Sequence, residues 1–456
     1  MKKIIIALVV VVAVVLAIPF VGNKIVQDEI AKNLEELSTY GIKTQERTSN
    51  NTYLKTKDHL EFFIEDGDKF LSFLNKYSAS QIPPYSGSLF NGTLVGVDLE
   101  YWNFPISDAL AVTIYPLELP FEIKEAILKE NHTLGIYLEN FFKNKTLVYQ
   151  LNFNVARGGF DGYLKDIKEN LTLDNGAKVS LDILGMSYQG EGEIISPTKV
   201  SSKLDKLSFK ASKDLENIVF EMNNITTDSI FKSEYSYKST IDAKSFYFKI
   251  NDFRQNVSFD SKDFSLVMAT DTSADKIKAH VETSLKEIEL KATQGAINIK
   301  DFNHALYISD VDKTSYEAVE AIIKKAKDSL LPVDEVVLQE SLIELLLKGV
   351  QIDLKDLSIG SITIENKDLK AIKLKAKIII KPTQSTNTDL EHVMLLMQKN
   401  ISVDARLEVS KEIFGYISAQ APLAGLAVMY AKDEGDKYVF EVKFGDDELS
   451  INGKPL

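Results

Sequence analysis

The stretch "INIKDF" at residues 297–302 belongs to a pattern that recurs as "FEMNNI" (220–225), "FKINDF" (248–253) and "IDLKDL" (352–357). Positions one and three share one face of a strand, because successive side chains point to opposite sides. The apolar residue at position six has the opposite parity, so the strand must bulge or end at the polar pair before it. The unequal spacing argues against a solenoid with a fixed period. We predict repeated strand units that finish in the same way.

The sequence around these hexapeptides alternates between apolar and polar residues. Runs such as "TLVYQLNFNV", "KVSLDILGMSY" and "SFYFKIND" are separated by turns rich in Asn, Asp, Gly and Ser. Such alternation is typical of antiparallel strands with one apolar and one polar face. We therefore predict an antiparallel β-meander over residues 40–313.

Helical patterns precede and follow this region. Val26, Ile30, Leu34 and Leu37 form one helical stripe, which predicts a stalk helix over residues 23–39. Residues 314–456 form a predicted C-terminal α+β region, with helices at 315–331, 333–349, 388–400 and 411–430. Two apolar runs around "GDDE" (445–448) predict a final β-hairpin. The expected fold class is α+β and β-rich.

The beginning of the chain is strongly hydrophobic. Lys2 and Lys3 precede an uncharged run from Ile4 to Val21, which as a helix would measure about 27 Å, close to the hydrocarbon thickness of a bilayer. We predict a transmembrane signal anchor over residues 1–22, rather than a cleaved signal peptide or a buried core helix. The positive-inside rule then places the N-terminus in the cytoplasm. The expected location is the inner (cytoplasmic) membrane, single-pass, with the bulk of the chain periplasmic.

Composition and motifs argue against several functions. The net charge of −13 argues against nucleic-acid binding, and without cysteine there is no disulfide, thiol nucleophile or thiolate metal site. The five histidines are not spaced as a metal motif, and neither a nucleophile elbow nor a phosphate-binding loop is present. We assign no catalytic, cofactor-binding or metal residues, expect no cofactor, and predict that the protein is not an enzyme.

The last third of the chain carries a family resemblance. The segments are "LYISDVDKTSYEAVEAI" (306–322), "LLKGVQIDLKDLSIGSITIENKDLKAIKLKAKI" (346–378) and "KYVFEVKFGDDELSINGKPL" (437–456). Together with the N-terminal run, they resemble the YdgA-like family of bacterial membrane-anchored envelope proteins, a domain of unknown function. The resemblance implies a strand leading through Asp into a helix, paired strands after a helix, and a closing hairpin. It supplies no catalytic residues.

Three functional hypotheses follow. The first is a membrane-tethered periplasmic, non-catalytic protein whose β-rich surface or groove binds an apolar ligand such as a lipid, or an envelope protein partner. The second is a structural or assembly protein of the cell envelope without a ligand, for which a homo-oligomer is one form. The third is an envelope hydrolase whose carboxylates or serines converge only on folding. The membrane itself is the expected partner of residues 1–22.

Overall fold

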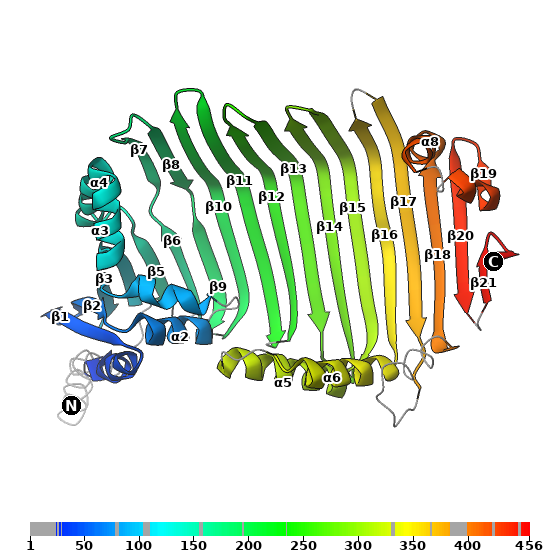
Figure 1. Cartoon of the computed structure of the whole chain (residues 1–456). Helices are drawn as coiled ribbons and strands as arrows, with labels where there is room; N and C mark the ends of the chain where they lie inside the picture. The colour runs from blue at the N-terminus through cyan, green and yellow to red at the C-terminus, as the bar shows by residue number, and fades with distance from the viewer. Residues whose placement is uncertain are drawn as a thin grey trace, which may run out of the picture. The chain divides into compact units, whose positions relative to one another are not determined.

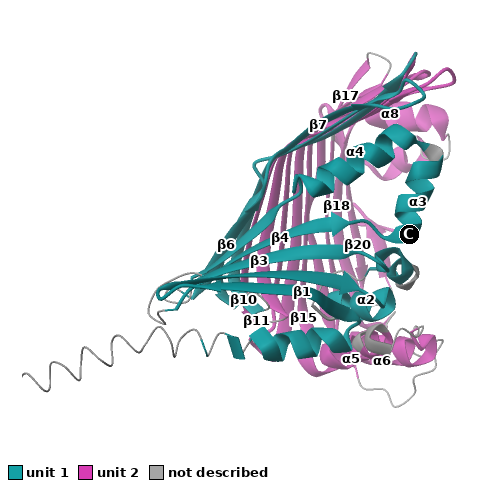
Figure 2. Ribbon diagram, turned by 90° about the vertical axis from the view of Figure 1, so that its left-hand side faces the viewer, with its two compact units in different colours: residues 1–214 teal, residues 215–456 magenta. Residues whose placement is uncertain are grey.

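A computed structural model describes residues 24, 27–28, 30–77, 82–103, 110–154, 158–193, 196–233, 235–329, 333–364, 367–383, 399–421, 425–445 and 448–456. The chain divides into two compact units, Met1–Asp214 and Leu215–Leu456, which Figure 2 shows in different colours. Each unit is built on antiparallel strands. The units are described separately below.

The first described element of unit 1 is helical, at residues 24, 27–28 and 30–39. In this helix Gln27 donates from Nε2 to Oδ2 of Asp58 (2.8 Å). Its strands are β1 (Ile42–Asn51), β2 (Lys55–Ile64), β3 (Leu94–Trp102), β4 (Leu110–Glu118), β5 (Tyr149–Asn154), β6 (Gly159–Leu164), β7 (Ile167–Thr172), β8 (Lys178–Leu184), β9 (Ser187–Glu193) and β10 (Ser196–Lys213). Strands β1 to β6 pair antiparallel in chain order.

Strands β7 to β10 complete the sheet of unit 1, which bends between β8 and β9. β10 pairs with β9 over its first half and with β8 over its second half, in one register from Lys199 onward. β6 pairs with β9, and β7 pairs with β8. Segments β6 and β7 therefore follow one line of the sheet, as do β8 and β9. Gly185, with φ of +64°, lies at the bend between β8 and β9, where a side chain at that φ would be strained.

The helices of unit 1 connect neighbouring strands. α2 (Gly67–Tyr77) and the 3₁₀ helix η1 (Pro84–Phe90) join β2 to β3. The hairpin of α3 (Phe121–Glu130) and α4 (His132–Lys143) joins β4 to β5. Asn131 caps α4 by accepting a hydrogen bond from the backbone N–H of Leu134 (2.9 Å).

Unit 2 contains a series of long strands, and Figure 1 shows β11 to β18 running side by side. The strands of unit 2 are β11 (Glu216–Ser233), β12 (Ser236–Asn251), β13 (Asn256–Asp271), β14 (Lys276–Ala292), β15 (Gly295–Asp312), β16 (Val350–Ile364), β17 (Lys367–Ile380), β18 (Ile401–Ser410), β19 (Lys432–Glu434), β20 (Lys437–Gly445), β21 (Glu448–Ile451) and β22 (Lys454–Pro455). Each pairs antiparallel with the next, except that β18 pairs with β20, beside which β19 also lies.

Helices pack at two opposite ends of this sheet. α5 (Lys313–Ser329) and α6 (Glu335–Leu347) connect β15 to β16, and they lie along one end of the strands in Figure 1. Their apolar residues, Tyr316 and Leu345 among them, pack against buried Ile277 and Val350. α8 (Lys411–Gln420) follows β18 and lies near the other end, followed by the 3₁₀ helix η2 (Leu426–Tyr430). Ile413 of α8 belongs to another buried cluster, together with Val409 and Phe440.

A line of irregular residues crosses the unit 2 sheet between these ends. Three of its residues, Asn224, Asp263 and Asp301, have left-handed backbones with φ of 48°, 52° and 53°. The paired residues on both sides of them keep one register, so Asn224 lies opposite Lys244 on the next strand. A left-handed residue in a strand redirects the chain at that point. We call this line, Asn224, Lys244, Asp263, Lys286, Asp301 and Gly360, the crease.

The crease accounts for two of the four hexapeptides. Asn224 and Asp301 are the fifth residues of "FEMNNI" and "INIKDF". In "IDLKDL" the register shifts between Leu354 and Leu357, and in "FKINDF" the strand ends at Asn251. The predicted bulge or strand end is thus present in "IDLKDL" and "FKINDF". In "FEMNNI" and "INIKDF" the prediction is wrong, because the ladder continues in register through a left-handed residue. A Cβ on Gly360 would lie 3.0 Å from Cβ of Asp301, so the crease also requires a small residue there.

We expect Asn224→Val to destabilise the protein by about 1–3 kcal/mol, because a β-branched residue resists a left-handed backbone. Asn224→Gly should be close to neutral, since glycine adopts this conformation freely. Thr226→Val, two residues along the same strand, is the control. The measurement is urea unfolding followed by circular dichroism. Equal stability of Asn224→Val and the control would contradict the role of the crease.

The predicted transmembrane anchor requires a correction. Among the described residues no helix is long and apolar enough to cross a membrane. A span needs about 20 consecutive apolar residues, whereas α5 has 17 and includes lysines and glutamates. Residues 1–22 lie outside the described residues. The fold class is therefore wrong in its transmembrane helix, and the predicted single-pass inner-membrane protein with a cytoplasmic N-terminus and a periplasmic bulk is not supported.

Two further expectations concern the C-terminal region. The sequence-based division at residues 313 and 314 stays a prediction. The two last long runs of the chain pair as β20 and β21, with Val442 opposite Ile451 and Phe444 opposite Leu449. The helix expected at 388–400 falls mostly outside the described residues.

Candidate functional site

One side of the unit 2 sheet carries mostly apolar side chains. Residues directly opposite each other in a ladder share a face, so the register defines rows that run across the strands. Three of these rows are Phe231, Tyr237, Thr270, Ala279, Ile308, Ile352, Ile378, Val403, Phe444 and Leu449; Ile225, Ala243, Phe264, Leu285 and Phe302; and Phe220, Phe248, Phe259, Leu290, Ile297 and Ile364. We call this side of the sheet the apolar face.

The apolar rows on both sides of the crease lie on the same face. Leu369 and Ile372 are three positions apart on β17, and simple alternation would place them on opposite sides. Both contribute to the cluster that packs beneath α8, together with Val409 and Phe440. The interruption of the strands thus keeps apolar side chains on one side along their whole length.

Side chains of the apolar face are buried where helices pack against them. Ile277, Val311 and Val350 are buried where α5 and α6 pack, and Val409 and Phe440 are buried near α8. Between these two places the side chains of Phe264, Leu285, Phe302 and their neighbours remain half-buried. Strands β11 to β16 at about 4.8 Å spacing make this uncovered part about 24 Å wide. A wide apolar surface with partly exposed side chains is a candidate binding surface.

The opposite side of the same sheet is polar. Lys244 pairs with Asp263 (Nζ to Oδ1, 2.5 Å), and Lys262 pairs with Glu287 (Nζ to Oε2, 2.7 Å). These pairs hold the carboxyl pKa of Asp263 and Glu287 below their ordinary values, chiefly through the lysine hydrogen bonds. Solvated ion pairs are the expected covering of a sheet face that meets water. The contrast between the two sides marks the apolar face as the functional candidate.

An ion cluster of unit 2 lies at the β18–β20 ladder. Oε2 of Glu408 accepts from Nζ of Lys437 (2.5 Å), and Oε1 accepts from Nε of Arg406 (2.8 Å). These two contacts lower the pKa of Glu408 from 4.5 to about 2. A lowered pKa stabilises the folded state above the unfolded pKa and loses that effect as the pH falls through the folded value.

We expect Glu408→Gln to reduce stability at pH 7 by about 1–2 kcal/mol, discounted for partial exposure of the pair. As the pH falls from 4.5 to about 2, the difference in stability between wild type and Glu408→Gln should disappear, because the Glu408 carboxylate of the wild type becomes protonated. Urea unfolding at pH 7 and pH 3 measures the change. Glu448→Gln, an exposed position on β21, is the control. A pH-independent difference between Glu408→Gln and wild type would contradict this assignment.

Unit 1 brings together polar residues that are distant in the sequence. Nδ1 of His59 lies 2.6 Å from Oδ1 of Asp98, because these residues are cross-strand partners on β2 and β3. The hydroxyl of Tyr115 donates to the same oxygen (3.1 Å), and Lys145 Nζ lies 3.7 Å from Oδ2. Burial raises the pKa of Tyr115. Each group here has a partner, which is typical of a structural ion cluster.

The other histidines do not converge with His59. His132 begins α4, and His280 stacks on Tyr307 on the polar side of β14 and β15, with 5.1 Å between ring centroids. His304 lies opposite Leu357 in a row of the apolar face, and His392 is outside the described residues. Across the part of the chain that the structure describes, no three His, Asp or Glu residues are grouped to hold a metal.

Comparison of the chain with protein-family models, curated proteins and solved structures finds no match. The resemblance to the YdgA-like family therefore stays a prediction. The candidate site rests on the geometry of the apolar face alone.

Proposed function

We propose that this protein binds the acyl chains of lipids on its apolar face, without catalysing a reaction. The observation that carries the proposal is the uncovered part of that face, where Phe264, Leu285 and Phe302 stand half-buried in the middle of a wide sheet. Covering these side chains would remove apolar surface from water, at about 25 cal/mol per Å².

The chemistry of the rows favours acyl chains over a folded protein. A protein interface contains about one hydrogen bond per 100–200 Å². The row from Ile225 to Phe302 has no side-chain donor or acceptor, and the backbone groups of its strands pair within the sheet. An acyl chain needs no hydrogen bonds and can bend with a curved surface. Its affinity for this face would come from burial alone.

The helices at both ends of the apolar face limit where bound acyl chains could lie. α5 and α6 cover one end of the apolar face and α8 covers part of the other. Chains lying across the strands between these helices would contact row after row of aliphatic and aromatic side chains. A lipid headgroup would remain outside the rows, because the rows offer it almost no polar partners.

The test is to purify the full chain without detergent and analyse it by native mass spectrometry, then extract it with organic solvent. We expect lipids with alkyl chains to co-purify. A photo-crosslinking residue at position 285 should label those lipids, whereas the same residue at 284, on the opposite side of β14, should not. Absence of lipid, with crosslinks from 285 to a second copy of the chain, would overturn the proposal in favour of an assembly role.

A further inference from the structure

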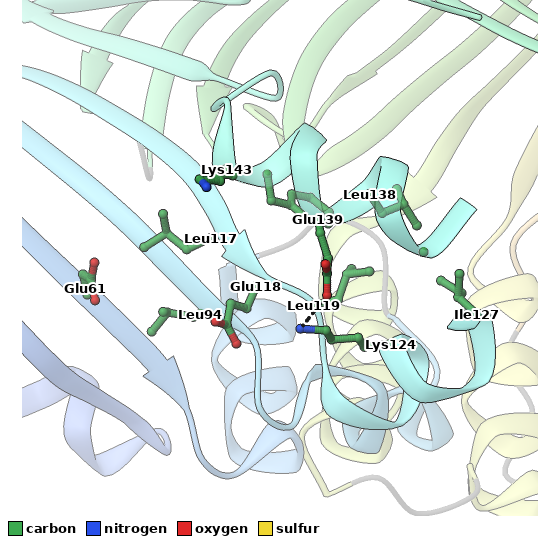
Figure 3. A pocket seen from close by; sticks show the side chains of 12 residues that line it. Glu61, Leu94, Leu117, Glu118, Leu119, Lys124, Ile127, Leu138, Glu139 and Lys143 are labelled. Atoms are coloured by element: carbon green, nitrogen blue, oxygen red, sulfur yellow. Dashed lines mark ion pairs between the residues drawn. The ribbon is translucent and has the colours of Figure 1, made fainter. Parts of the chain in front are cut away.

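Unit 1 contains a pocket of about 440 Å³. It lies between the α3–α4 hairpin and strands β2 to β4, and Figure 3 shows its lining. Pockets of 300–1,000 Å³ are typical of sites for small molecules. Its apolar lining consists of Leu94, Leu117, Leu119, Ile127, Leu138 and Phe142.

The packing of the two helices shapes this pocket. A Cβ on Gly135 of α4 would come within 2.2 Å of Cδ2 of Leu128, so glycine permits close approach of α3 and α4. Lys124 of α3 pairs with Glu139 of α4 (Nζ to Oε1, 3.2 Å), which Figure 3 marks with a dashed line. This ion pair ties the helices together and neutralises two of the charges at the pocket.

The lining of the pocket differs between its two ends, and we call the end at Glu61 the polar end. In Figure 3, Glu61 lies at one end, whereas Ile127 and Leu138 lie at the other. The side chain of Glu61 is 23% exposed, and its Oε1 lies 3.6 Å from Nε2 of His59. Because Asp98 contacts the other ring nitrogen of His59, the imidazole is held in place beside Glu61. The carboxylate of Glu61 is thus positioned on the strand at the polar end.

The charges that remain favour a cation. With Lys124 and Glu139 paired, the lining retains two carboxylates, Glu61 and Glu118, and one ammonium, Lys143. The chain as a whole carries −13, which attracts cations and repels anions at long range. We infer that this pocket binds a cationic amphiphile, whose amine pairs with Glu61 while its apolar body extends toward Ile127. This site does not rest on the proposed lipid binding.

The experiment compares dodecylamine, dodecanol and dodecanoate, each below its micellar concentration, by calorimetry on the full chain. The three probes share one alkyl chain, so their differences report the headgroup. We expect the amine to bind most tightly and dodecanoate most weakly. Glu61→Gln should weaken dodecylamine at least tenfold and leave dodecanol unchanged, and Leu138→Trp, which fills the apolar end, should weaken both.

Controls separate this pocket from the apolar face. Glu125→Gln removes an exposed carboxylate of α3 that does not line the pocket, and amine binding should be unchanged. Leu285→Glu alters unit 2 and should also leave tight amine binding intact. Tighter binding of dodecanoate than of dodecylamine, or equal amine affinity in Glu61→Gln and wild type, would overturn the inference. Loss of amine binding only in Leu285→Glu would assign it to the apolar face and overturn the pocket.

Discussion

Leu285→Glu is expected to abolish lipid co-purification, with at least a tenfold loss of bound lipid per chain. Leu285 lies in the row between Phe264 and Phe302 on the uncovered part of the apolar face. A carboxylate covered by alkyl chains would lose its hydration without gaining a partner, which costs several kcal/mol. In the lipid-free protein the same carboxylate reaches water, because this position is half-buried.

The matched control is Ser284→Glu. Ser284 precedes Leu285 on β14 and lies in the polar row between Ser265 and Asn303. This variant adds the same charge to the same strand and should retain its lipid. Circular dichroism melting of both variants shows whether each remains folded, and Leu285→Ala provides an uncharged change at the same site. Unchanged lipid content in folded Leu285→Glu would rule out the apolar face as the binding site.

Deletion of residues 445–456 is expected to destabilise unit 2 by at least about 3 kcal/mol. The deletion removes β21, which pairs with β20, and Ile451, which packs against the cluster of Phe440 and Ile413. It also removes Asn452, whose amide donates to the carbonyls of Tyr430 (2.6 Å) and Val439 (2.9 Å). Its Oδ1 accepts from the backbone N–H of Glu441 (3.0 Å).

Thermal melting of the full chain and the truncated chain measures this effect. Removal of Leu456 alone is the control, because its side chain is 60% exposed. Asn452→Ala should reproduce part of the loss, since its three hydrogen bonds connect η2, β20 and the terminal turn. A truncated chain that melts at the wild-type temperature would show that these residues are a dispensable tail.

Local patterns in the sequence indicated the strands of unit 2, whereas the meander predicted over residues 40–313 did not include the helices α2, α3 and α4. Alternation of apolar and polar residues has period two, and it identified the strands of unit 2 as one-sided. The parity change in "FEMNNI" and "INIKDF" indicated the break that Asn224 and Asp301 make. Hydrophobicity at residues 1–22 predicted a membrane span; these residues lie outside the described part of the chain, and no described helix is long and apolar enough to cross a membrane.

The candidate sites needed tertiary structure. The pair of His59 and Asp98 depends on the register of β2 and β3, which joins positions 39 residues apart. The pocket depends on how α3 and α4 pack over the strands, and no motif in their sequences signals it.

The sequence by itself determined that the strands carry one apolar side, because that property belongs to each short segment. Only the tertiary structure decided that this side stays the same across the crease and that its side chains are half-buried between α5, α6 and α8. Those facts depend on register and helix placement, which involve residues far apart in the chain.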